Sequence, residues 1–444
     1  MREVFPPSPT ILETSNALRE GRTTCRALVE TCIHAYEKHE PTVKAWVTFD
    51  REGAMKQAED LDREIAEARM RGPLHGIPIG VKDIVDVKGL RTEAGVRHWS
   101  NGPVEADAEI VSRLRKAGAV ILGKTVTTPY AWVDPGQTRN PWNTARTPGG
   151  SSSGSAAAVA AGMAMAAIGT QTGGSIIRPA SFCGVVGWKP SKTARSSRAG
   201  IVPFSETLDT PGFLTGRLED IGPLQDATGS PIGPITDRPY PPRLGRLRGF
   251  FDDRAEPEMR LALEQAVEAW KAAGAWVEEV ELPMFFTEVH AAHRAVMAFE
   301  LAVAHSARFA AMPHDYPAQV TKLLREGLAI AETTYRQALE LGEAVGRFLR
   351  PDLDAWITPA ALGEAPGLET TGEPYFNSPW TFGGQPVLTF PMAVSADGMP
   401  LGVQFIGVEG AEADMISAAL WCSRRIPVVS GDPTAVFSEN EADR

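Results

Sequence analysis

The stretch from Thr147 to Ser191 reads TPGGSSSGSAAAVAAGMAMAAIGTQTGGSIIRPASFCGVVGWKPS. Two serine-bearing glycine loops, residues 148–154 and 169–175, are joined by small residues from Ser155 to Ile168. Ala-rich segments favour helix, and this one has no charged residue, so we expect a buried helix between the loops. A flexible Gly/Ser linker would not flank such a segment, and residues 182–188 have the composition of a core strand.

The second loop ends in the run Thr172-Gly173-Gly174-Ser175. Consecutive glycines let several backbone N–H groups approach one point, which is what an oxyanion hole requires. A serine hydroxyl is a weak nucleophile and needs a base, and no histidine lies in the glycine-rich block. A lysine can serve as that base if burial lowers its pKa enough to make it neutral.

One lysine lies inside an apolar run. Residues 77–87 are rich in Ile and Val and are predicted to form a strand that contains Lys82. On this stretch alone, an exposed lysine at a sheet edge explains the pattern equally well.

Composition excludes several classes of protein. The 444 residues are enough for one large domain or two to three smaller ones, and the formal net charge of −11 argues against a non-specific nucleic-acid binder. The four cysteines have neither zinc-site nor disulfide spacing, so we expect a cytoplasmic protein without a metal. The most apolar run, residues 156–168, is too short to span a membrane.

Two local motifs suggest other chemistries. Residues 118–125 match the phosphate-loop pattern G-x-x-x-x-G-K-T, but their four middle residues are predicted to form a strand where that motif needs a loop. Residues 150–154 match the G-x-S-x-G nucleophile elbow of an esterase, but a turn-rich loop precedes them where the elbow needs a hydrophobic strand. His290 and His293 are three residues apart in a helical region, and we interpret them as surface or core residues because no metal-ligand motif accompanies them.

Several motifs together resemble the amidase signature family. They are Gly72–Pro78 followed by Val81-Lys82-Asp83, then Gly149–Ser175, and then Gly184–Pro190. Shorter likenesses occur at residues 208–210 and 398–404. The resemblance covers roughly residues 10–225 and 350–425 and leaves the middle of the chain without a motif.

The resemblance implies an α/β fold in which a mixed central sheet is sandwiched by helices. It implies a single amidase domain over residues 1–444, with the signature core at about 70–225. The region from about 287 to 350 would then be a helical insert that shapes the substrate pocket.

The resemblance also implies a Ser–cis-Ser–Lys triad that works without a cofactor. Matched residue by residue, the base falls on Lys82, the relay serine on Ser151 and the nucleophile on Ser175. The backbone N–H groups of Thr172 and of its neighbours Gly173 and Gly174 would form the oxyanion hole, together with that of Ser175.

The chain departs from the family pattern in a few places. Gln171 stands where Asp is usual, Ile177 stands where Arg is usual, and an arginine follows one place later at Arg178. Ser153 replaces a glycine of the first loop. Our hypothesis is that the first two changes are linked, so that a buried ion pair has become a neutral contact, and that restoring Asp at Gln171 destabilises the protein.

We predict an amidohydrolase that cleaves apolar or aryl non-peptide amides through an acyl-enzyme. Carbamate (urethanase) and ester hydrolysis would use the same machinery. The candidate substrate-binding residues are Tyr130, Trp132, Gln171 and Trp380, because aromatic walls favour apolar groups. For the aromatic residues, a place in the core is an equally good interpretation.

The main alternative is the A subunit of a tRNA-dependent amidotransferase, which forms glutaminyl- or asparaginyl-tRNA with the same triad. A catalytically dead scaffold is disfavoured, because all three triad residue types are present. Under the main interpretation the partner is a small amide or carbamate, with no direct nucleic-acid partner and no membrane contact, and the chain is a monomer or homodimer.

Overall fold

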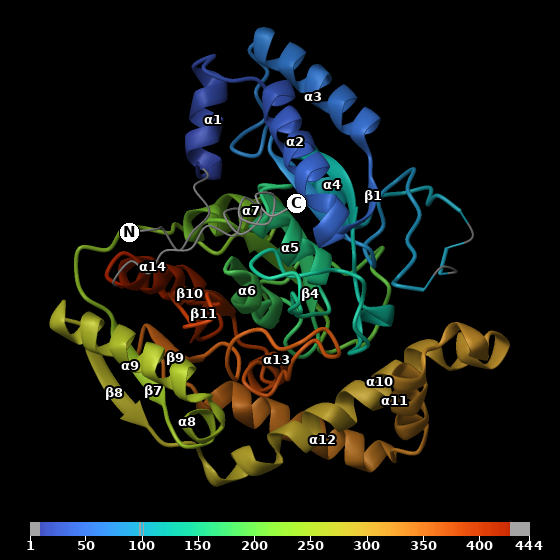
Figure 1. Ribbon diagram of the computed structural model, residues 1–444. Coiled ribbons are helices and arrows are strands. Elements are labelled where there is room, and N and C mark those ends of the chain that lie inside the picture. Colours follow the sequence, from blue (N-terminus) through green and yellow to red (C-terminus); the bar gives the residue numbers. More distant parts are fainter. Residues whose placement is uncertain (1–8, 97–98, 101, 427–444) are drawn as a thin grey trace.

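The computed structural model describes residues 9–96, 99–100 and 102–426. Within these residues one sheet of eleven strands has the order β1-β3-β2-β4-β6-β5-β10-β11-β9-β7-β8. Its two edge strands, β1 and β8, lie at the upper right and lower left of Figure 1. The pairs β2–β3, β2–β4, β7–β8 and β7–β9 are parallel, and the other pairs are antiparallel. The predicted mixed sheet is therefore confirmed. The strands are β1 (Trp46–Phe49), β2 (Pro78–Lys82), β3 (Val120–Thr125), β4 (Ala166–Gln171), β5 (Val186–Lys189), β6 (Thr210–Thr215), β7 (Arg243–Leu247), β8 (Trp276–Val280), β9 (Ala355–Pro359), β10 (Val387–Val394) and β11 (Pro400–Ile406).

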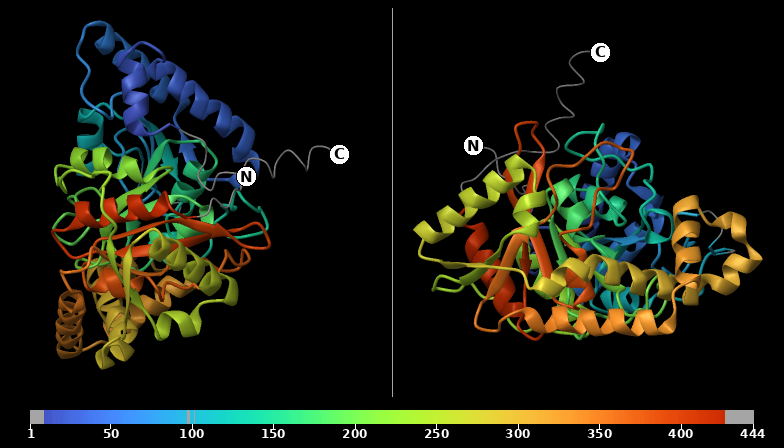
Figure 2. Two further views of the ribbon diagram at one scale, coloured as in Figure 1. Left: turned by 90° about the vertical axis from the view of Figure 1, so that its left-hand side faces the viewer. Right: turned by 90° about the horizontal axis from the view of Figure 1, so that it is seen from below.

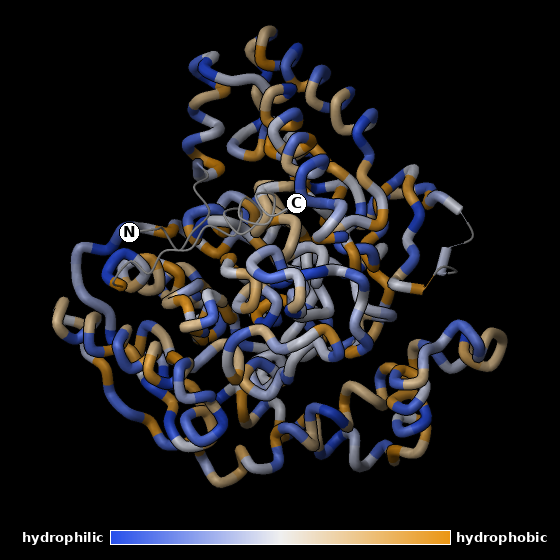
Figure 3. The backbone as a smooth tube through the Cα atoms, viewed as in Figure 1, coloured by the Kyte–Doolittle hydropathy of each residue, from blue (hydrophilic) through white to orange (hydrophobic). Residues whose placement is uncertain are grey.

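Helices pack against this sheet along its length (Figure 2). The outer helices alternate between polar and apolar residues in Figure 3, as expected where one face of a helix contacts the core. The helices are α1 (Ile11–Arg19), α2 (Cys25–Val43), α3 (Arg51–Ala66), α4 (Glu109–Lys116), α5 (Ser153–Ala160), α6 (Ile177–Cys183), α7 (Ile221–Ala227), α8 (Phe250–Arg254), α9 (Pro257–Ala272), α10 (Val289–Ala311), α11 (Ala318–Leu328), α12 (Glu332–Phe348), α13 (Ser378–Phe382) and α14 (Glu412–Ser423). Short 3₁₀ turns are η1 (Pro129–Ala131), η2 (Leu218–Asp220), η3 (Met284–Glu288) and η4 (Pro313–Asp315).

The small-residue segment between the glycine loops differs from the expected single helix. Helix α5 ends at Ala160, the chain turns at Gly162 with a φ of +68°, and strand β4 begins at Ala166. A left-handed φ of this kind favours glycine and interrupts the helix. Both pieces are buried, so the sequence carries no amphipathic period that would separate helix from strand.

The expected core strand over residues 182–188 is also shorter than predicted. Phe182 and Cys183 are the last residues of α6, which ends at Gly184 with a φ of +66°. Strand β5 begins only at Val186. The glycine therefore separates helix from strand within an apolar run that looks uniform in sequence.

The expected helical region, about 287–350, contains η3, α10, η4, α11 and α12. Figure 2 shows α10 to α12 side by side at one edge of the molecule, with α11 at the projecting end. Helix α10 packs on α11, α12 and α13.

Candidate active site

Strand β2 ends at Lys82 and lies between β3 and β4, parallel to both. All five of its residues are buried, which explains the continuous apolar run in the sequence. Lys82 Nζ donates to Ser151 Oγ at 2.7 Å and to Thr170 Oγ1 at 2.9 Å. Lys82 is therefore an interior residue, and the alternative of an exposed edge lysine is wrong.

The environment of Lys82 favours its neutral form. Burial lowers the pKa of Lys82 from its usual 10.5 to about 7, although the Asp209 carboxylate acts in the opposite direction. The two hydroxyl groups that contact Nζ are uncharged, so they compensate only in part for the loss of water. At neutral pH about half of the molecules carry the free amine that a general base requires.

Ser151 lies in the first glycine loop, after a cis peptide bond to Gly150. Gly149 precedes them with a φ of +81°, and a Cβ there would lie 2.8 Å from Pro179 Cα. Only glycine therefore fits where this loop passes α6. Among the described residues no hydrogen bond joins Ser151 Oγ to Ser175 Oγ, so the proton relay between them is a proposal.

Ser175 is half-buried in the turn between β4 and α6 and borders a cavity, as do Thr172, Gly173 and Gly174. Within the part of the chain that the structure describes, the N–H groups of residues 173–175 donate no hydrogen bond to the protein. Three consecutive free N–H groups beside a partly exposed serine are what an oxyanion hole needs.

The cavity beside Ser175 has a volume of about 620 Å³. Its walls come from the turn after η1, residues 172–175 with the predicted nucleophile (here called the nucleophile loop), α10, α11 and the loop before α13. Charged residues of both signs line it together with aromatic ones. The charged residues are Asp134, Arg178, Arg294, Lys322, Glu369 and Glu373. The aromatic residues are Trp132, Phe204, His290, His293 and Tyr375.

Arg178 is the buried cation of this cavity. Its Nε donates to Thr371 O and its Nη2 to Gly150 O, each at 2.7 Å. Its Nη1 has no hydrogen-bond partner among the described residues. Burial lowers the pKa of Arg178 to about 10, and the Glu373 carboxylate opposes that change. The guanidinium therefore stays charged at neutral pH, and its Nη1 is a buried donor without a partner in the described part of the chain, in a residue that lines the cavity.

The predicted aromatic walls are only partly present. Trp132 lines the cavity and stacks on Phe204, with ring centroids 5.6 Å apart. Tyr130 instead stacks on Tyr316 in the interior, and Trp380 is fully buried. Neither Tyr130 nor Trp380 lines the cavity, so their proposed substrate contact is corrected here to a role in packing.

Gln171 is also a buried structural residue and does not line the cavity. Its Oε1 accepts the backbone N–H groups of Ile176 at 2.9 Å and Ile177 at 3.0 Å, and its Nε2 donates to Thr381 Oγ1 at 3.0 Å. All its strong hydrogen-bonding directions point into the protein, so the expected substrate contact is not formed. The sequence shows Gln171 as a departure from the family pattern but not what it contacts.

His290 and His293, which the sequence predicts to be surface or core residues, lie in the cavity wall. Burial lowers the pKa of each to about 4, so both are neutral at pH 7. In the described ranges no group of three or more His, Cys, Asp or Glu side chains is arranged to hold a metal ion. None of the helices described there is both long and apolar enough to cross a membrane.

Comparison with known families gives a match over most of the chain. A family model described as Amidase matches residues 27–416. The chain belongs to the amidase family. A solved structure described as an amidase is 33% identical, has a TM-score of 0.87 and covers 94% of this chain and 100% of its own. The peptide amidase from Stenotrophomonas maltophilia is 29% identical with a TM-score of 0.82, covering 96% of this chain and 98% of its own.

The curated relatives of this amidase-family chain carry a more specific name, the A subunit of glutamyl-tRNA(Gln) amidotransferase. The relative of that name from Geobacter sp. (strain M21) is 31% identical over 92% of this chain and 96% of its own length. The relative of the same name from Syntrophus aciditrophicus is 38% identical over 62% of this chain. That second match spans 60% of the relative's length.

These names contradict one prediction. The sequence predicts a monomer or homodimer without a nucleic-acid partner. The relatives are named as one subunit of an enzyme that acts on glutamyl-tRNA, which implies protein partners and a tRNA for that group. The acidic net charge does not exclude such an assembly, because one subunit can leave tRNA contact to its partners.

Proposed function

We propose that the chain cleaves the C–N bond of an amide through an acyl-enzyme on Ser175. The Ser175 hydroxyl attacks the carbonyl carbon, and its proton passes through Ser151 to Lys82. The same proton then goes to the leaving nitrogen, and water releases the acyl group. The observation that supports this proposal is the 2.7 Å contact between Lys82 Nζ and Ser151 Oγ, at a lysine whose pKa is about 7.

We further propose that the substrate is a small polar amide. Arg178 Nη1 is free beside the nucleophile loop, and Glu369 and Glu373 lie in the same wall. A substrate with a carboxylate or carbonyl for Arg178 and a donor for an acidic residue fits these charges better than an aryl amide does. The alternative substrates, aryl amides, carbamates and esters, are supported by the aromatic part of the lining, chiefly Trp132, Phe204 and Tyr375.

The wall that faces Ser175 includes His290, His293 and Arg294 from α10 and Gln319 and Lys322 from α11. We therefore propose that residues from about 287 to 350 form the selective part of the pocket within a single amidase domain.

The second candidate is the A subunit of a tRNA-dependent amidotransferase. The names of the curated relatives support it more strongly than they support an aryl amidase. Its amide donor would be glutamine, whose carboxylate and ammonium groups match the two signs of charge in the cavity.

One screen tests these proposals. The purified chain is offered glutamine, a short aliphatic amide, an anilide and an aryl carbamate, with Ser175→Ala as the blank, and ammonia or amine release is measured. Turnover of the polar amides by the chain alone supports a stand-alone amidase. Turnover of glutamine only in a co-purified complex supports the amidotransferase alternative. Turnover of the anilide alone would refute the polar-pocket proposal.

A further inference from the structure

The carbonyl groups of the nucleophile loop are all held by the protein, in contrast to its free N–H groups. His293 Nε2 contacts Thr172 O at 2.8 Å, and Thr381 Oγ1 donates to Gly173 O at 2.8 Å. Gly174 O accepts the Arg178 N–H at 3.0 Å, and Ser175 O accepts the Ser152 N–H at 3.2 Å. Two of these four carbonyls are thus fixed by side chains from outside the glycine-rich block.

A held carbonyl also sets the direction of the next N–H group. The peptide group is planar and trans, so its C=O and N–H point in opposite directions. The contact of Thr172 O with His293 turns the Gly173 N–H away from α10. The contact of Gly173 O with Thr381 turns the Gly174 N–H away from α13. Two glycines in sequence would otherwise let both planes rotate at little cost.

We infer that His293 and Thr381 are positioning residues that orient the oxyanion-binding N–H groups of Gly173 and Gly174. This inference rests on the proposed function of Ser175 as the nucleophile. A carbonyl oxygen only accepts, so His293 Nε2 carries the proton in this contact. Thr381 Oγ1 donates to Gly173 O and accepts from Gln171 Nε2.

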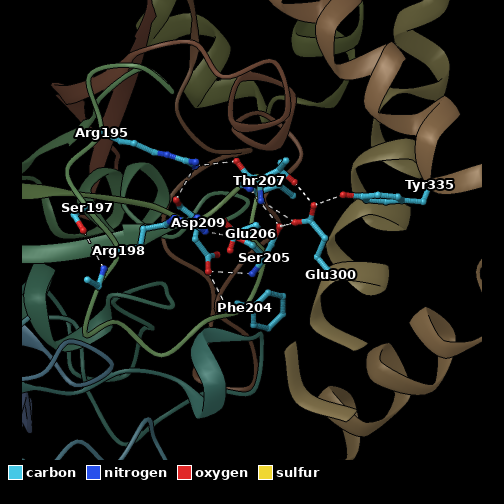
Figure 4. Close-up of polar contacts among 12 residues, drawn as sticks. Arg195, Ser197, Arg198, Phe204, Ser205, Glu206, Thr207, Asp209, Glu300 and Tyr335 are labelled. Carbon is cyan, nitrogen blue, oxygen red and sulfur yellow. Dashed lines mark hydrogen bonds and ion pairs between the residues drawn. The ribbon is translucent and has the colours of Figure 1, made fainter. Parts of the chain in front are cut away.

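Helix α10 is also held by hydrogen bonds of a buried residue two turns after His293. Glu300 lies seven residues later, on the same face of the helix, and is buried. Its carboxylate accepts the Thr207 N–H at 2.9 Å, the hydroxyls of Ser205 and Thr207, and the Tyr335 hydroxyl at 2.7 Å (Figure 4).

The loop that Glu300 holds leads back to the nucleophile loop. Asp209 accepts the N–H groups of Phe204 at 2.8 Å and Ser205 at 3.0 Å (Figure 4). It also accepts the Thr172 hydroxyl at 2.5 Å. Thr172 is therefore held at its hydroxyl through this loop and at its carbonyl through His293. Glu300 and His293, from which these two connections start, lie on one face of α10. Together they fix the peptide group between Thr172 and Gly173, whose N–H is part of the proposed oxyanion hole.

The test uses a small alkyl fluorophosphonate, which needs no knowledge of the natural substrate. Ser175 Oγ forms a bond to phosphorus, the P–F bond breaks, fluoride leaves and the serine proton passes to Lys82 through Ser151. Saturation kinetics followed by intact-mass spectrometry give the inactivation rate constant kinact and the half-saturating concentration KI. Oriented N–H groups stabilise the charged phosphoryl oxygen in the transition state, so misorientation lowers kinact and leaves KI unchanged.

Two matched pairs of variants separate hydrogen bonding from packing. His293→Leu removes the donor to Thr172 O, and His293→Gln supplies an amide donor instead. Thr381→Val removes the hydroxyl at constant shape, and Thr381→Ser keeps it. We expect kinact to fall on the order of 100-fold in the Leu and Val variants, the effect of small misplacements at reacting centres. The Gln and Ser variants should recover most of the wild-type rate.

His34→Leu, an exposed histidine on α2, is the control for the loss of a histidine. Melting temperatures are measured for every variant, and the Thr381 pair decides if His293→Leu does not fold. The inference is overturned if His293→Leu and Thr381→Val both keep the wild-type kinact. It is also overturned if these substitutions change only KI. Failure of the reagent to label Ser175 in the wild-type chain overturns the proposed function itself.

Discussion

The buried amine of Lys82 makes the protein less stable than a neutral side chain would at that position. The unfolded chain keeps the usual pKa of 10.5, and burial lowers it to about 7 in the folded chain. Each pKa unit corresponds to about 1.4 kcal/mol, and the amine in the folded chain is about half protonated at pH 7. The difference in pKa therefore lowers the free energy of unfolding at pH 7 by about 4 kcal/mol. Lys82→Met removes this cost with an unbranched apolar side chain of similar length.

The substitution also removes the hydrogen bonds of Lys82 Nζ. The contact with Thr170 O, at 3.5 Å, is at the limit of hydrogen-bond distance and adds little. Ser151 Oγ and Thr170 Oγ1 each lose the hydrogen bond from Nζ, at a cost of about 1 kcal/mol each. We therefore expect Lys82→Met to be more stable than the wild-type chain by about 2 kcal/mol at pH 7 and to be inactive. A base that lowers stability while it supports catalysis is a common cost of an active site.

The sign of the pH dependence makes the prediction specific. The folded-state pKa lies below the unfolded-state pKa, so between pH 7 and 10.5 the unfolded chain binds more protons and wild-type stability rises with pH. The advantage of Lys82→Met should therefore be largest at and below pH 7. It should fall to zero at about pH 9, where the remaining burial cost equals that of the lost hydrogen bonds, and reverse toward pH 10.5.

Urea unfolding at pH 7 and at pH 10, followed by circular dichroism, measures this advantage. Lys116→Met, at an exposed position on α4, is the control and should change little at either pH. An equal stabilisation at both pH values, or a Met variant less stable than wild type at pH 7, would refute the assignment of Lys82 as a buried, largely desolvated amine.

Further outcomes follow from the same geometry. The value of kcat/KM should rise with pH around a midpoint of about 7, because only neutral Lys82 accepts a proton, and a profile that rises only near pH 10 would contradict this. Ser175→Ala should abolish fluorophosphonate labelling whereas Ser152→Ala should not, and peptide mapping of the label checks both. Gln171→Glu should lower the free energy of unfolding by about 1–3 kcal/mol. A carboxylate oxygen would then face the oxygen of the Thr381 hydroxyl, whose proton is already donated to Gly173 O. An unchanged thermal unfolding temperature would contradict this prediction. Incubation with EDTA should leave turnover unchanged, since no metal-ligand cluster occurs among the described residues, and restoration of lost activity by a divalent cation would reverse this view.

The limits of sequence reasoning are clearest in the buried segments. Residues 155–168 and 182–188 are apolar on every side, so periodicity could not tell helix from strand. The boundaries lie at Gly162 and Gly184, which have positive φ values in the folded chain, and the sequence does not show which of its glycines adopt that conformation. The aromatic residues posed the same problem, because a buried Trp380 and a cavity-lining Trp132 look alike in sequence.

From the sequence alone, the resemblance carried by several short motifs in a fixed order identified the family and the mixed α/β fold and suggested the candidate triad. It could not determine the walls of the cavity, which come from segments more than a hundred residues apart. Only the tertiary structure showed that Arg178 lines this cavity, that its buried Nη1 has no partner among the described residues, and that His293 contacts Thr172 O. Both depend on which backbone groups remain unpaired after packing, and side-chain identity alone does not specify that.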